Sequence, residues 1–168
     1  MDPVPLDSRE PLTPAGQADD EVGPLAPPLH AFGRSTRVVS LPLRVLVADD
    51  YVDAAESLAL VLSIKGVTTH VAVDGAQALA CANRWRPHVC VLDIGMPKLD
   101  GYEIARRIRE QKWTERPLLS ALTGWTTEQN RRSAFEVGFD HYMTKPADPT
   151  TLVRILQGFL DSARVMRA

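Results

Sequence analysis

Short hydrophobic runs alternate with longer amphipathic stretches from residue 43 to about residue 163. Each run is rich in apolar, often branched residues and ends at a glycine, a proline or a polar side chain, which is typical of buried β-strands. The pattern predicts five strands, at residues 44–48, 67–73, 89–93, 117–122 and 139–143.

The stretches between these runs repeat apolar residues every three or four positions, which is typical of helices that bury one face. Gly66 and Gly138 favour helix ends where they stand, and Asp148 is typical of a residue that caps the start of a helix. The pattern predicts five helices, at residues 53–65, 76–84, 102–111, 126–137 and 150–163. The third is expected to carry three arginines mostly on its outer face: Arg106, Arg107 and Arg109.

Strands that alternate with helices indicate a parallel sheet covered by helices on both faces. Right-handed crossovers leave few strand orders, and five such units commonly wind in the order 2-1-3-4-5. The sequence therefore predicts an α/β fold with a doubly wound, five-stranded parallel sheet. About 120 residues are enough for one core of this kind.

The terminal segments and the overall composition exclude several classes of structure and function. Residues 1–42 hold eight of the 13 prolines and no periodic apolar pattern, which predicts a disordered leader, and residues 164–168 are expected to form a short tail. A net charge of −2 argues against a general nucleic-acid or membrane-surface binder, and neither a membrane span nor a secretory signal is visible. Cys81 and Cys90 form no CxxC pair and are interpreted as buried, reduced side chains in the cytoplasm.

Polar residues stand where four of the predicted strands end. Because the carboxyl ends of parallel strands share one edge, these residues should meet in one cleft. They are Asp49, Asp50, Asp93, Thr123 and Lys145. Three carboxylates this close repel one another, and a magnesium ion (Mg²⁺) together with the lysine would relieve them. An oxygen-rich pocket with an ammonium and a hydroxyl suits a phosphoryl group, and Asp93 is the best candidate for a nucleophile that forms an acyl phosphate.

The stretch from Leu43 to about Ala163 resembles the receiver domain of two-component response regulators, the CheY-like domains with a flavodoxin-like fold. Five separated positions carry the resemblance, in the right order and on the right elements. They are Asp49-Asp50, Asp93 followed by Met96-Pro97 and Asp100-Gly101, Thr123, Tyr142 and Lys145-Pro146.

The resemblance implies a role for each of these positions. Asp93 would accept a phosphoryl group from a phosphohistidine of a sensor histidine kinase or a histidine phosphotransfer protein. Lys145 would pair with the phosphoryl oxygens, after an often cis peptide bond to Pro146. Thr123 and Tyr142 would act as the switch. The implied magnesium ligands are Asp50, Asp93 and the Gly95 carbonyl, with Asp49 acting through water.

Two positions depart from common family choices. Gly95 places no side chain over the phosphoryl group, and Trp125 is unusually large, so both should change how water reaches the acyl phosphate. With no output domain expected after the last helix, signalling would occur through protein contacts of the last two helices and the last strand. We expect neither direct nucleic-acid binding nor membrane association. The histidines are expected to be surface or loop residues: His70, His88 and His141.

Three other functions compete with this one. A magnesium-dependent aspartyl phosphatase of the haloacid dehalogenase kind would want a second aspartate where Gly95 stands. A flavodoxin-like nucleotide binder would offer amides and hydroxyls after the first strand, whereas Asp49 and Asp50 would repel a phosphate. An unphosphorylated scaffold would not need the complete set of acids.

Overall fold

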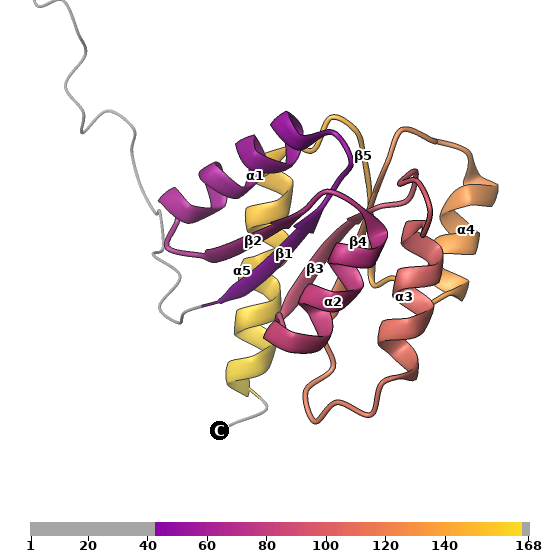
Figure 1. Ribbon diagram of the computed structural model, residues 1–168. Helices are drawn as coiled ribbons and strands as arrows, with labels where there is room; N and C mark the ends of the chain where they lie inside the picture. Colours follow the sequence, from indigo (N-terminus) through magenta and orange to yellow (C-terminus); the bar gives the residue numbers. More distant parts are fainter. Residues whose placement is uncertain (1–42, 166–168) are drawn as a thin grey trace, which may run out of the picture. The chain divides into compact units, whose positions relative to one another are not determined.

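Five parallel strands form the centre of the protein. The computed structural model describes residues 43–165, so the predicted leader and most of the predicted tail lie outside the described residues. The sheet has the strand order β2-β1-β3-β4-β5, and every neighbouring pair is parallel, as the sequence predicts (Figure 1). The strands are β1 (Arg44–Ala48), β2 (Thr68–Ala72), β3 (Val89–Asp93), β4 (Leu118–Thr123) and β5 (His141–Thr144).

Helices cover both faces of this sheet. One hydrophobic cluster joins the sheet to α1 and α5, and a second joins the opposite face to the other three helices (Figure 1). The helices are α1 (Val52–Ile64), α2 (Gly75–Trp85), α3 (Gly101–Glu110), α4 (Glu128–Glu136) and α5 (Pro149–Val165). Within residues 43–165, none of the helices is long and apolar enough to cross a bilayer.

The hydrophobic runs are continuous because both faces of the sheet are buried. In β1, Val45 and Val47 face the cluster under α1 and α5, whereas Leu46 and Ala48 face the other cluster. Successive side chains of a strand point to opposite faces, so a strand between two helical layers needs apolar residues at every position. All five residues of β3 are buried, including Asp93 at its end.

Several predicted boundaries shift by a few residues. The helix predicted from residue 126 begins at Glu128, because the Thr127 hydroxyl accepts the Asn130 amide and caps it. The strand predicted at 139–143 lies at 141–144, because the Phe139 N–H still bonds to the Ala134 carbonyl at the end of α4. The last helix continues to Val165, past the predicted end at residue 163.

Arg109 corrects the expectation for α3. Arg106 and Arg107 are exposed and pair with Glu103, as predicted. Arg109 instead turns inward with only 13% of its side chain exposed. It donates hydrogen bonds to the carbonyls of Gly138 (2.8 Å) and Pro117 (2.7 Å) and to the Asp140 carboxylate (2.6 Å). Arg109 therefore joins α3 to the residues that precede β4 and β5.

The two cysteines differ in their surroundings. Cys90 is fully buried in β3, as predicted. Cys81 is only half-buried on α2, where its Sγ lies 3.5 Å from Nδ1 of His70. The His70 ring stacks on Trp85 with centroids 4.0 Å apart, so His70 is an exposed strand residue whose ring is covered on one side.

Candidate acidic site at the carboxyl edge of the sheet

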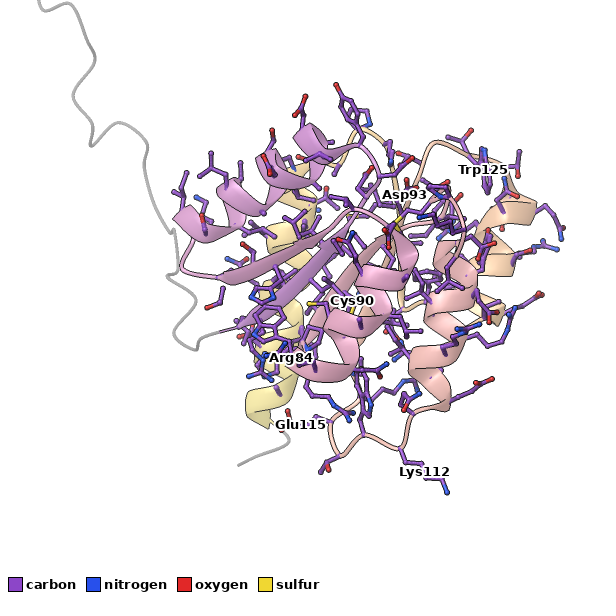
Figure 2. All side chains as sticks on the ribbon, in the orientation of Figure 1. Arg84, Cys90, Asp93, Lys112, Glu115 and Trp125 are labelled. Carbon is purple, nitrogen blue, oxygen red and sulfur yellow. The ribbon has the colours of Figure 1, made fainter. Side chains whose placement is uncertain are left out.

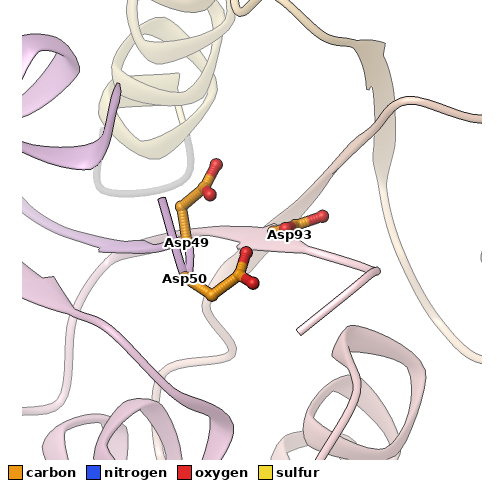
Figure 3. A group of neighbouring side chains, drawn as sticks. All are labelled: Asp49, Asp50 and Asp93. Atoms are coloured by element: carbon orange, nitrogen blue, oxygen red, sulfur yellow. The ribbon is translucent and has the colours of Figure 1, made fainter. Parts of the chain in front are cut away.

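Three aspartates meet where β1 and β3 end. Asp49 and Asp50 follow β1, Asp93 closes β3, and the two strands are direct neighbours in the sheet. One carboxylate oxygen from each residue lies within 4.8 Å of the others. Figure 3 shows the three side chains directed toward one region beyond the strand ends. The predicted acidic cluster therefore forms.

Backbone amides hold two of these carboxylates in place. Asp49 and Asp93 are only 1% and 4% exposed, whereas Asp50 is exposed to solvent. Oδ1 of Asp49 accepts the Tyr51 N–H at 2.9 Å, and Oδ1 of Asp93 accepts the Gly95 N–H at 2.9 Å. These bonds fix the rotation of both side chains and leave their Oδ2 atoms available to other partners.

Lys145 takes up both of these Oδ2 atoms. Its Nζ lies 2.8 Å from Oδ2 of Asp49 and 2.8 Å from Oδ2 of Asp93. The lysine follows β5, its N–H donates to the Thr123 carbonyl at 2.7 Å, and its peptide bond to Pro146 is cis, as expected. Partial burial alone would lower the pKa of Lys145, but the hydrogen bonds to Asp49 and Asp93 outweigh burial and raise it.

The predicted switch residues lie on β4 and β5, beside the acids. Thr123 is 2% exposed, and its Oγ1 accepts the Trp125 N–H at 3.1 Å. The Tyr142 hydroxyl donates to the Trp125 carbonyl, and burial raises the pKa of this hydroxyl. Thr123 and Tyr142, the two predicted switch residues, thus form hydrogen bonds with the backbone N–H and C=O of Trp125.

The two unusual positions both contact residues of the site, since the Gly95 N–H donates to Asp93 and the Trp125 N–H donates to Thr123. A Cβ placed on Gly95 would have only the Asp93 carboxylate oxygens nearby, at 3.6 and 3.9 Å, which is ordinary contact. The Trp125 side chain is 51% exposed on the loop after β4. Figure 2 shows it at the same edge of the domain as Asp93.

The donor set fits a hard divalent cation. It consists of carboxylate oxygens, one of which belongs to an exposed residue, and it contains neither thiolate nor imidazole. Mg²⁺ prefers one or two carboxylates with several retained waters, whereas structural zinc sites favour cysteine and histidine. Within the described part of the chain, this is the one group of three such side chains close enough to share an ion.

One supporting residue was quoted in the sequence motif without a role. Gly101 begins α3, and a Cβ there would lie 2.5 Å from the Asp93 carbonyl oxygen and 2.9 Å from Cα of Ile94. The absence of a side chain lets α3 start directly against the backbone that carries Asp93. In the sequence, the one sign of this close packing was the pair Asp100-Gly101 at a predicted helix start.

Comparison with known proteins identifies the family. A family model described as the response regulator receiver domain matches residues 45–157. The chain belongs to this family. The chain is 37% identical to the transcriptional regulatory protein TrcR of Mycobacterium tuberculosis over 132 residues, which cover 79% of this chain and 51% of TrcR. It is 38% identical to the response regulator MprA of Mycobacterium sp. strain KMS over 63% of this chain and 45% of MprA.

A smaller relative is matched over most of its length. It is an uncharacterized 14.6 kDa protein in the sodA1 3' region of Leptolyngbya boryana, 36% identical over 68% of this chain and 88% of that protein. The chain thus spans about half the length of the named curated regulators and nearly all of this small protein.

Solved structures agree with the fold and the family. A putative response regulator from Chloroflexus aurantiacus has a TM-score of 0.67 at 30% identity, covering 72% of this chain and 99% of that one. The chemotaxis response regulator CheY4 of Vibrio cholerae has a TM-score of 0.66 at 28% identity, covering 71% of this chain and 99% of that one.

Proposed function

We propose that this receiver domain accepts a phosphoryl group on Asp93 and signals through the contacts that phosphorylation changes. The phosphodonor would be a phosphohistidine of a sensor histidine kinase or of a histidine phosphotransfer protein. The observation that carries the proposal is the position of Lys145, whose ammonium bridges the two buried carboxylates beside an exposed third one.

Asp93 is the nucleophile in this proposal. A carboxylate oxygen attacks phosphorus, the bond between phosphorus and the imidazole nitrogen breaks, and the imidazole keeps the electron pair. The Gly95 N–H and Lys145 hold the carboxylate in one orientation before the reaction, so no rearrangement is needed to aim it. Because Gly95 carries no side chain, this position adds no bulk over the carboxylate that the phosphohistidine side chain must approach.

The remaining acids would hold a divalent cation. Asp50, Asp93 and the Gly95 carbonyl are proposed as direct ligands of Mg²⁺, and Asp49 as a ligand through water. A bound Mg²⁺ would neutralise negative charge on the carboxylates and on the transferring phosphoryl group. Lys145 would then move its hydrogen bonds from Asp49 and Asp93 to the new phosphoryl oxygens.

Thr123 and Tyr142 are proposed to report the phosphorylation. If the Thr123 hydroxyl turns to the phosphoryl group, it gives up the Trp125 N–H, and the Tyr142 hydroxyl can follow inward. The surface most affected would be α4, β5 and α5. A partner protein would bind this surface, and two curated relatives carry names of transcriptional or response regulators.

The proposed function also implies where the domain would work and which reactions it would catalyse. The domain would work in the cytoplasm, where histidine kinases present their phosphohistidine, and would catalyse only its own phosphorylation and dephosphorylation. The leader at residues 1–42 is proposed to be dispensable for that chemistry. Removing residues 1–40 should leave melting and labelling of Asp93 nearly unchanged.

A small phosphodonor tests the assignment of Asp93. The full chain is incubated with acetyl phosphate and Mg²⁺, and a phosphoryl adduct is measured by intact-mass spectrometry before and after treatment with hydroxylamine, which cleaves acyl phosphates. Wild type and the matched control Asp100→Asn, which keeps a capping side chain at α3, should gain a labile adduct. Asp93→Asn should not, and equal labelling of this variant would refute the proposal.

A further inference from the structure

A thiol and an imidazole meet at one edge of the sheet. Sγ of Cys81, on α2, lies 3.5 Å from Nδ1 of His70, on β2. β2 comes first in the strand order, so among residues 43–165 it has β1 as its single neighbour in the sheet (Figure 1). His70 is exposed and Cys81 is half-buried, so the pair lies at the surface of the domain. Neither residue has a part in the acidic site or in the function proposed above.

Neighbouring side chains orient both donors. The ring of His70 stacks on the indole of Trp85, with centroids 4.0 Å apart and planes 5° from parallel. Trp85 follows Cys81 by four residues on α2, so the same face of this helix presents the thiol and the indole to the imidazole. Cys81 also packs against the hydrophobic cluster between α2 and the sheet. The ring is therefore restrained in tilt and the thiol in position before any ligand arrives, which lowers the entropy lost on binding.

The distance between the two donor atoms suits a zinc ion. Zinc lies about 2.3 Å from a thiolate sulfur and about 2.0–2.1 Å from an imidazole nitrogen, with tetrahedral angles between its ligands. By the law of cosines, two such bonds place the sulfur and the nitrogen roughly 3.5 Å apart. The observed separation of Sγ and Nδ1 is 3.5 Å. A zinc ion can therefore bind to Cys81 and His70 with little movement of either side chain.

The protonation state of the thiol favours a metal ion over an oxidation reaction. Burial raises the pKa of the Cys81 thiol, so at neutral pH the sulfur keeps its proton. A protonated thiol is a poor nucleophile and reacts slowly with oxidants. A metal ion changes this balance, because it displaces the proton and neutralises the thiolate. Sulfur and imidazole together are typical ligands of zinc, whereas magnesium prefers oxygen.

We propose that Cys81 and His70 form half of a tetrahedral zinc site, which a second copy of the chain completes. Structural zinc sites almost always have four protein ligands, and this pair supplies two of them. Among the described residues, no third histidine, cysteine or acidic side chain lies close enough to join the pair, since the acidic cluster is the one such group of three. A two-fold axis through the ion would add the same two donors from the second copy and give a Cys2His2 site. The two domains would meet at their β2 edges, and β5, at the other end of the strand order, would stay free.

The test uses the full chain, with zinc itself as the probe. The protein is kept reduced with a phosphine, and excess Mg²⁺ is present to compete for the acidic site. Zinc is added stepwise, the molar mass is measured by light scattering, and the bound metal is quantified after gel filtration. Wild type should bind one zinc ion for every two chains, its molar mass should double, and EDTA should reverse both changes. Cobalt in place of zinc should give the visible absorption of a tetrahedral site and a sulfur-to-cobalt charge-transfer band.

Variants of the two donors separate zinc binding from folding. Cys81→Ser and His70→Gln should each lower zinc affinity by roughly a hundredfold or more, because each removes two of the four ligands from the dimer. Both should melt close to wild type without zinc, since neither residue is fully buried. Cys90→Ala and His141→Gln are the matched controls, because they alter the other cysteine and a histidine of β5, at the other end of the strand order. Both controls should bind zinc and dimerise like wild type.

Several results would overturn the proposal. Zinc that does not bind, cobalt that gives no charge-transfer band, or equal zinc-dependent dimerisation of Cys81→Ser would each exclude the site. One zinc ion per chain without a change in molar mass would exclude its completion by a second copy. Asp93→Asn should bind zinc like wild type, so the outcome here does not depend on whether Asp93 is the phosphorylation site.

Discussion

Replacing Lys145 by methionine should destabilise the metal-free protein, since the ammonium is the group that lies between two buried carboxylates. Its two hydrogen bonds, at 2.8 Å to Asp49 and 2.8 Å to Asp93, are charge-assisted. About 30% of the lysine side chain is exposed, so solvent screens the interaction, and we assign about 1 kcal/mol to each bond. Losing both should lower the free energy of unfolding by roughly 2 kcal/mol, or Tm by about 8 °C for a domain of this size.

Magnesium should reverse much of this loss. A cation bound with a concentration tenfold above its Kd stabilises a folded protein by about 1.4 kcal/mol. Lys145→Met leaves the carboxylates without a competing ammonium, so Mg²⁺ should stabilise the variant more than it stabilises wild type. The difference in Tm between the two proteins should therefore shrink by half or more when Mg²⁺ is added.

Thermal melting followed by circular dichroism, with and without Mg²⁺, measures both effects. Lys98→Met is the matched control, because Lys98 is an exposed lysine on the loop after Asp93 and has no ion pair within residues 43–165. It should melt like wild type under both conditions. If Lys145→Met melts like wild type without metal, or if the difference is the same with Mg²⁺, Lys145 does not balance the charge of these acids.

Three further changes test the supports of the site. Gly101→Ala forces a Cβ to within 2.5 Å of the Asp93 carbonyl oxygen and should destabilise folding by about 1–3 kcal/mol in chemical denaturation. Gly158→Ala is the control, because its Cβ would have no neighbour within 4 Å, and it should be neutral or stabilising. Arg109→Ala removes the arginine donor from two carbonyls and from Asp140, which keeps the Leu119 N–H. The variant should lose about 3 kcal/mol in the same assay, with Arg109→Lys losing less. Folding raises the pKa of Lys145 above its ordinary value of 10.5. The stabilisation that the charged lysine gives is therefore complete below pH 10.5 and is lost as the pH rises further. In urea titrations at alkaline pH, the difference in stability between wild type and Lys145→Met should shrink.

The fold was predictable because its strands and helices depend on short-range patterns, and the acidic site because the strand order then places its residues. A strand buried on both faces needs an unbroken apolar run, and β3 has one that ends at Asp93. Once the strands are parallel, their carboxyl ends must lie at one edge, which brings Asp49 and Lys145 to Asp93 from distant parts of the chain. That these side chains meet could be predicted without knowing any distance.

The supporting contacts were not predictable, because they depend on side chains that reach between elements. Arg109 follows two exposed arginines in α3 and shares their helical pattern, yet it turns inward to carbonyls 8 and 29 residues away. Cys81 packs against the edge of the core, as an apolar helix face predicts, but it also meets His70 of the edge strand. The position of the Thr123 hydroxyl, on the Trp125 amide, likewise depends on loop geometry.

The peptide groups around Trp125 link two side chains that would otherwise be independent. The Thr123 hydroxyl accepts the Trp125 N–H, and the Tyr142 hydroxyl donates to the Trp125 carbonyl. Neither Thr123 nor Tyr142 can therefore change rotamer without disturbing the loop that the other residue contacts. In the proposed switch, such a linkage would favour an all-or-none transition over a graded one. The indole at that position would then act as a built-in optical reporter, whose emission changes in a single step with the state of the domain.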